Sequence, residues 1–448
     1  MSDPRALLLD CEAAVRNARG LGADQVEVFA TAHRSTQVDL QKDDVHTAST
    51  EEETTFGVRV FKGGSLGFST VNGRAHLDEA CREALALAAA APADARNGLA
   101  EPGEVKPFER PLDAAIEQLD VASLVEHAAE LLARIRDRDA RVRVDSGSVS
   151  AQQLARAVAS STGVALCDAS AHASADVFGM AVDGSDVGSF DTEGIAVLHA
   201  AELGAQIPLM SERFVEKCVG ALGARKAESF RGSVVLAPEV VATFVLGNLF
   251  PVLSGKAVRT GRSPLAGRIG QRVAEPSLSV IDDGRLLEGV SSGAFDREGT
   301  ATRRNVLIEN GVLRGFLYDV YEARAAGVAP TGNGRGGAGS LPAIAPCNVI
   351  VPPGAAAYAA LCGEPERAVL VSRFSGSSNP ISGEFSGVVK GGFLLRKGER
   401  IPIRETLVAG NLYDLLGAIS GVSKEVRSLR GSAFVPALRV ENISVTAG

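Results

Sequence analysis

The first half of the chain alternates between helical and strand-like hydrophobic patterns. Helical spacing of apolar residues is expected to form helices at residues 7–18, 77–91, 121–135 and 214–222. Asp120 and Ser211 stand where the last two of these helices are expected to be capped. Alternating apolar and polar positions predict strands at 26–30, 54–61 and 65–71 and within 142–198. Strands grouped between long helices favour an α+β fold over a repeated β-α-β arrangement.

Beyond about residue 228 the pattern changes to short apolar runs separated by glycine turns. Pro238 is expected to open a helix that runs to about Phe250, and a further helix is expected at 318–326. Asn310-Gly311 separates two apolar runs, which is a strong short-range signal for a hairpin within 305–316. The change of pattern predicts an N-terminal α+β domain at 1–228 and a C-terminal β-rich domain at 229–448.

Composition and charge exclude several classes of protein. The 448 residues include 46 Lys and Arg against 54 Asp and Glu, a net charge of −8 that opposes direct binding to nucleic acid or to an anionic membrane. No apolar run approaches the ~18 residues that a membrane-spanning helix requires. The N-terminus lacks the apolar core of a signal peptide. A cytoplasmic location is therefore expected, with no membrane contact.

Residue types that bind metals or act as general bases are scattered. The six cysteines lie at least fifteen residues apart, so no pair has the short spacing of a zinc or redox motif. All six histidines lie in the first half, and the closest two are thirteen positions apart, so HExxH and related motifs are absent. The residues alone reveal no catalytic constellation.

One glycine-rich stretch, residues 331–337, formally matches the dinucleotide pattern GxGxxG. That function requires a preceding strand and a helix that begins at the last glycines. Here a helix is expected before the stretch and Leu341-Pro342 follows it closely, so the dinucleotide interpretation is rejected. Exposed amides in such a loop could instead bind an extended peptide, and a plain connector is an equal alternative. The candidate residues lining a substrate cavity are Gly332, Asn333, Gly334 and Arg335.

Several short segments, taken together and in order, resemble one known family. In the first half they are residues 57–61, Gly64 and 67–70. In the second half they are Ser254-Gly255, Ser263, 267–270, 281–284, 295–299, 302–304, 307–311, 331–333, 383–387 and 409–412. This order is similar to that of the TldD/PmbA family, also called modulator-of-gyrase proteins, over nearly the whole chain. The resemblance and the pattern together imply an N-terminal antiparallel sheet with long flanking helices and a barrel-like C-terminal domain with a few helices.

The resemblance also identifies the branch of the family. TldD-branch members are zinc peptidases whose helix carries HExxxH, with a cysteine in the C-terminal domain as a further ligand. Counted back without gaps from residues 267–270, the two histidine positions fall on Leu246 and Pro251 and the glutamate position on Gly247. Counted from residues 383–385, the cysteine position falls on about Val389. Leucine, proline and valine side chains offer no lone pair to Zn²⁺. The chain therefore resembles the PmbA, or TldE, branch, and neither a metal nor a catalytic residue is expected in it.

This resemblance implies a non-catalytic subunit of a TldD/TldE-type zinc metallopeptidase heterodimer. A TldD-like partner with HExxxH would supply zinc and the general base, and the substrates would be unfolded or leader peptides or natural-product amides. Two alternatives remain: a homodimeric peptide-binding protein without hydrolase activity, and a stand-alone enzyme of unidentified chemistry.

Overall fold

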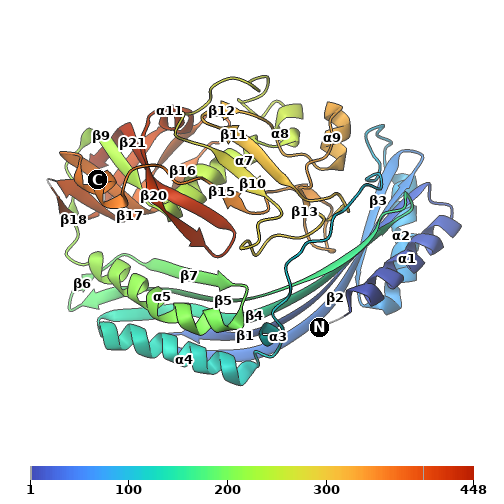
Figure 1. Cartoon of the computed structure of the whole chain (residues 1–448), viewed down its shortest axis with the longest axis horizontal. Coiled ribbons are helices and arrows are strands. Elements are labelled where there is room, and N and C mark those ends of the chain that lie inside the picture. The colour runs from blue at the N-terminus through green and yellow to red at the C-terminus, as the bar shows by residue number, and fades with distance from the viewer. Residues whose placement is uncertain (1–2, 397, 448) are drawn as a thin grey trace.

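A strongly curved antiparallel sheet of long strands makes up most of the first half (Figure 1). The computed structural model describes residues 3–396 and 398–447. The strands of this sheet are β1 (Gln25–Gln41), β2 (Asp44–Lys62), β3 (Ser65–Asn72), β4 (Val142–Ser160), β5 (Ala165–Asp183), β6 (Asp186–Val187) and β7 (Asp191–Val197). Their order is β3-β2-β1-β4-β5-β6, with β7 also paired to β5, and every pairing is antiparallel as predicted.

Helices cover one face of this sheet in two separate pairs. Its helices are α1 (Pro4–Gly20), the 3-10 turn η1 (Arg74–His76), α2 (Leu77–Ala90), α3 (Ala114–Glu117), α4 (Val121–Arg138) and α5 (Ala200–Gly220). α1 and α2 pack on one end of the sheet, where they bury Val28 and Ala30 of β1, while α4 and α5 cover the other end around Val38 and Leu40. Both pairs lie on the outer side of the curve (Figure 1), and the C-terminal end of α5 reaches the second half, where Lys217 contacts Glu239 of α6.

The long strands extend well beyond the predicted segments. β1, β2, β4 and β5 each have 17–19 residues, whereas alternation alone indicated five residues of β1. The middle of β1, around Arg34 and Thr36, lies between the two helix pairs and carries polar side chains on both faces. Without one apolar face, the period-2 signal of a strand is lost.

Two local features of the first half show why its helices lie where they do. Asp120 caps α4 as predicted, since its carboxylate accepts a hydrogen bond from Ser123 N at 2.9 Å. The prediction that Ser211 caps a helix is wrong: Ser211 lies inside α5, where its hydroxyl donates to Ile207 O at 2.8 Å. Toward the N-terminus the apolar stripe of α5 continues past Pro208 to Leu203, and the helix begins at Ala200.

The second half forms a closed five-stranded barrel. Its strands are β9 (Phe230–Leu236), β16 (Arg367–Ser378), β17 (Glu384–Arg396), β19 (Thr406–Asn411) and β21 (Ala433–Ala447). Each strand pairs with the next, and β21 pairs with β9 to close the ring. The predicted barrel-like, β-rich character of this half is confirmed.

Short strands and helices surround the barrel. The strands are β8 (Arg225–Lys226), β10 (Val280–Asp283), β11 (Arg304–Glu309), β12 (Val312–Leu313), β13 (Gly334–Arg335), β14 (Ala343–Ile344), β15 (Val349–Ile350), β18 (Glu399–Arg404) and β20 (Ile419–Leu429). The helices are α6 (Pro238–Val240), η2 (Val241–Leu246, a π-helical turn), α7 (Gly247–Val252), α8 (Gly255–Arg259), α9 (Val320–Ala326), α10 (Tyr358–Gly363) and α11 (Leu412–Gly417). Asn310 (φ 48°) and Gly311 (φ 77°) form the predicted hairpin turn between β11 and β12.

The helix expected from Pro238 is confirmed as the continuous segment α6-η2-α7, and it plugs the barrel. Phe244 of η2 contacts the rings of Phe374 and Phe385, each with a centroid separation of 4.8 Å. Side chains from all five barrel strands surround these rings and leave a cavity of only about 10 Å³. The barrel is therefore a packed core, not an open channel. In the part of the chain that the structure describes, no helix has the length and apolar character needed to cross a membrane.

Candidate functional site

The four positions predicted to correspond to the zinc motif lie around the barrel core. Leu246, at the end of η2, and Val389, on β17, are 3% and 2% exposed and belong to that core. Gly247 and Pro251 lie on the exposed side of α7. Among the described residues, no group of three or more His, Cys, Asp or Glu side chains is arranged to hold a metal. The donor set at these positions does not fit Zn²⁺, because two side chains are aliphatic, one is a proline ring and one is absent.

Gly247, the position predicted for the motif glutamate, leaves open space beside α7. Its backbone is helical (φ −58°), and a Cβ placed there would meet only the Ala242 carbonyl oxygen, at 3.9 Å. We expect Gly247→Ala to raise the free energy of unfolding by about 0.5–1 kcal/mol, because alanine restricts the unfolded chain and favours the helix. Urea denaturation measures the change.

The matched control for this substitution is Gly67→Ala in β3. A Cβ at Gly67 would overlap the Ala84 carbonyl oxygen of α2, which packs directly on the strand. Gly67→Ala should therefore destabilise the protein. If Gly247→Ala were also destabilising, the space beside α7 would not be open.

The glycine-rich candidates of residues 332–335 lie in a buried turn. Asn333 is fully buried: its amide donates to Asp282 Oδ2 at 2.7 Å and to Ala345 O at 3.1 Å, and it accepts from Asn305 at 3.1 Å. Gly332 and Gly334 are also buried, whereas Arg335 is half-buried and donates to Ser291 O at 3.4 Å. These contacts show a structural use for Asn333, and a substrate contact by any of the four stays a prediction.

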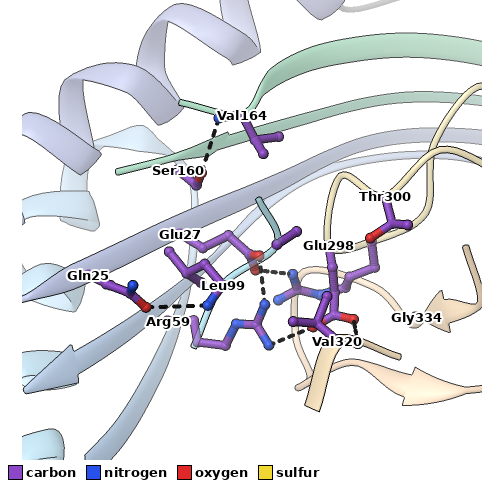
Figure 2. A network of polar contacts seen from close by, with 12 residues as sticks. Gln25, Glu27, Arg59, Leu99, Ser160, Val164, Glu298, Thr300, Val320 and Gly334 are labelled. Atoms are coloured by element: carbon purple, nitrogen blue, oxygen red, sulfur yellow. Dashed lines mark hydrogen bonds and ion pairs between the residues drawn. The ribbon is translucent and has the colours of Figure 1, made fainter. Parts of the chain in front are cut away.

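Four buried charged side chains join the two halves of the molecule. Figure 2 labels three of them, Glu27, Arg59 and Glu298. Arg59 of β2 donates to Glu27 of β1 at 2.7 Å and to Glu298 at 3.0 Å, and Arg297 donates to Glu27 at 2.8 Å. All four are at most 5% exposed. Two arginines against two glutamates make the cluster neutral, and each carboxylate has at least one arginine partner. We call Glu27, Arg59, Arg297 and Glu298 the interdomain network.

Asp296 lies beside this network and is fully buried. Its carboxylate accepts backbone hydrogen bonds from Glu298 (2.9 Å), Thr300 (3.0 Å) and Gly334 (2.8 Å). Burial, with repulsion from the Glu298 carboxylate, raises the pKa of Asp296 to about 7. The raised pKa means that folding favours the protonated carboxyl.

This shift predicts a pH dependence of stability. The pKa of Asp296 is higher in the folded protein, about 7, than in the unfolded chain, near 4. The protonated carboxyl therefore stabilises the fold fully below about pH 4, and this stabilisation is lost as the pH rises through about 7. Wild-type protein should therefore lose stability relative to Asp296→Asn between about pH 4 and pH 7. Urea denaturation of both proteins across this range measures the difference, and parallel curves would contradict the assignment.

Two of the segments that carried the family resemblance, residues 57–61 and 295–299, meet at this interface. A Cβ at Gly57 of β2 would overlap the Ala338 carbonyl oxygen, and one at Gly299 (φ 78°) would overlap the Val164 side chain. Phe29 and Phe295 pack in the same small apolar cluster between the halves. Sequence reasoning missed this role, although a charged residue such as Arg59 within an apolar strand was an available signal.

A second contact between the halves borders a cavity of about 350 Å³. Lys217 of α5 donates to Glu193 of β7 at 2.6 Å and to Glu239 of α6 at 2.9 Å. Arg427 of β20 forms ion pairs with the same two glutamates. Since α5 and β7 belong to the first half and α6 and β20 to the second, these pairs also hold the domains together.

The two halves are thus a curved antiparallel sheet and a closed five-stranded barrel filled by the helical segment α6-η2-α7. Residues 229–447 match the family model of the PmbA/TldA metallopeptidase C-terminal domain, and residues 26–88 match that of PmbA/TldA metallopeptidase domain 1. The chain belongs to the TldD/PmbA family and is TldE-like.

Individual relatives agree with this membership. The crystal structure of TldE from Thermococcus kodakarensis is similar with a TM-score of 0.90 and 26% identity, over 98% of this chain and 100% of that one. A metalloprotease from Methanothermobacter thermautotrophicus is 25% identical over 416 residues, covering 90% of this chain and 89% of the relative. An uncharacterized protein of Methanocaldococcus jannaschii is 34% identical over 192 residues, which is less than half of either chain (42% and 45%).

Proposed function

We propose that this chain is the non-catalytic, TldE-like subunit of a zinc metallopeptidase heterodimer. A TldD-like partner carrying HExxxH supplies the zinc and the general base. The complex cleaves unfolded or leader peptides or natural-product amides.

One observation carries the proposal. The chain keeps the family fold, but Leu246, Pro251 and Val389 stand at the positions of the metal ligands and Gly247 at that of the base. Zn²⁺ requires nitrogen, sulfur or oxygen donors, and a peptidase also requires a base to activate the attacking water. A chain with this fold and without these groups contributes to hydrolysis through what it binds.

An open sheet edge supports peptide as the ligand class. β3 pairs only with residues 55–62 of β2, so residues 44–54 of β2 pair with β1 alone within the described part of the chain. An extended peptide can add to such an edge through backbone hydrogen bonds with little dependence on its sequence.

Co-purification with a HExxxH-bearing relative tests the proposal. We expect a stable complex that hydrolyses an unfolded peptide, with stoichiometric zinc in the relative and none in this chain. A complex made with the relative's motif glutamate replaced by glutamine should bind peptide without cleaving it. The proposal fails if the isolated chain holds stoichiometric zinc, or if it hydrolyses peptide alone in the presence of a chelator.

A further inference from the structure

The cavity between α5 and the barrel has the size and lining of a small-molecule site. Its volume of about 350 Å³ falls in the range of about 300–1,000 Å³ that is usual for such sites. Apolar side chains of the second half form much of its wall, among them Pro238, Leu370, Phe393 and Ile403. The site lies on the far side of β17 from the barrel core: Val389 points into the core and Lys390, the next residue, lines the cavity.

The strands around this cavity are irregular at the residues that line it. In the β16–β17 ladder, Val371 pairs with Gly392, Arg373 with Gly391 and Phe374 with Val389. The ladder therefore skips Ser372 on β16 and Lys390 on β17. The β20–β21 ladder also shifts register, between residues 422 and 426. Bulges bend strands and redirect side chains, and they are frequent beside binding sites. Here they direct Ser372 and Lys390 to one cavity.

The charges deep in the cavity wall balance one another. Glu193 and Glu239 are each paired with both Lys217 and Arg427. Burial raises the pKa of the adjacent Asp191, while the positive charges of Lys217 and Arg373 oppose that rise. Glu193 and Glu239 are therefore matched by Lys217 and Arg427, so the deep wall offers a ligand no unpaired cation.

The charges at the rim do not balance. Two carboxylates also lie at the rim: Glu216 pairs with Arg138 at 3.7 Å, whereas Glu425 keeps its negative charge and accepts a hydrogen bond from Tyr358 N at 2.8 Å. Arg213, Lys390 and Arg400 also line the cavity. Within residues 3–396 and 398–447, none of these three cations has a carboxylate at ion-pair distance; Arg400 contacts the Cys362 thiol.

We infer that this cavity binds an apolar compound that ends in a carboxylate, with its apolar body against Leu370 and Phe393 and its carboxylate at Lys390 and Arg400. A cationic rim over an apolar wall complements such a ligand, because charge-assisted hydrogen bonds form at the rim while apolar surface is buried below. Two sources share this chemistry: the C-terminal residue of a peptide, and a free fatty acid. The inference concerns the isolated chain and does not depend on the proposed zinc-bearing partner.

Calorimetric titration of the purified chain tests the inference with three probes. These are the peptide acetyl-Gly-Ala-Leu with a free carboxylate, the same peptide as its C-terminal amide, and decanoate. We expect the free-carboxylate peptide to bind at least about tenfold more tightly than the amide, and Lys390→Gln or Arg400→Gln to weaken it by about tenfold each. Lys424→Gln removes an exposed lysine of β20 outside the cavity and serves as the matched control, with unchanged affinity expected.

Ser372→Trp adds a second, independent variant, because a bulky side chain at the half-buried bulge should block the cavity and abolish binding. Melting temperatures establish that each variant is folded. Binding of decanoate alone would support the cavity and identify a fatty acid as its ligand, while binding of the peptide would identify a chain terminus. The inference would be overturned if the peptide acid and its amide bound with equal, measurable affinity, or if neither the peptide acid nor decanoate bound at millimolar concentration. An equal loss of affinity in Lys424→Gln would also overturn it.

Discussion

Replacing Arg297 by alanine is expected to lower the free energy of unfolding by about 3–5 kcal/mol, the usual cost of breaking a buried ion pair from one side. Arg297 is 2% exposed, donates to Glu27 at 2.8 Å and lies 4.6 Å from the centre of the Phe29 ring. Its removal leaves a Glu27 oxygen buried without its partner and opens a cavity beside Phe29. Because Arg297 and Glu27 come from different halves, the loss falls on the interface between the domains.

The matched control for Arg297 is Arg314→Ala. Arg314 forms an ion pair with Glu309 at 3.0 Å, but both side chains are about half exposed, so the change should be about 0–1 kcal/mol. Urea denaturation measures both variants, and limited proteolysis between the domains reports whether the interface has opened. Equal small effects from the two substitutions would mean that the interdomain network adds little to stability.

Phe244→Ala is expected to have a comparable effect, about 3–5 kcal/mol, from a different cause. Phe244 is 8% exposed and fills the barrel between Phe374 and Phe385. The surrounding barrel is closed by hydrogen bonds on every strand, so it cannot contract around the missing ring. The substitution therefore enlarges the residual cavity of about 10 Å³.

Thermal and urea denaturation measure the Phe244→Ala effect, with Ile269→Ala as the control. Ile269 is 57% exposed, and its truncation should change stability by less than about 0.5 kcal/mol. Xenon or benzene should bind to Phe244→Ala and raise its melting temperature, because an apolar cavity stays dry and accepts such ligands. A loss below 1 kcal/mol would show that the barrel has collapsed onto the vacated space.

Together these substitutions separate two kinds of stabilisation. The barrel is held by continuous apolar packing around α6-η2-α7, and the contact between the domains includes a small number of buried ion pairs. The proposed binding cavity and the interdomain network both lie between the halves.

Local pattern predicted much of the fold where one face of an element is uniformly apolar. The cap of α4 at Asp120, the hairpin turn at Asn310-Gly311 and the helix from Pro238 follow from residues within a few positions of one another. The start of α5 and the full length of β1 did not follow. Pro208 interrupts the pattern of α5, and the middle of β1 has no consistently apolar face.

The sequence by itself determined that the side chains of Leu246, Pro251 and Val389 offer no lone pair to zinc, because donor atoms belong to residue types. It also determined the α+β class through the periods of its apolar residues. Only the tertiary structure decided that Arg59 meets Glu298, 239 positions away, and that Lys390 faces a cavity beside α5. Such contacts depend on sheet curvature, strand register and domain docking. Packing over the whole chain sets these features, so the periodicity of nearby residues does not predict them.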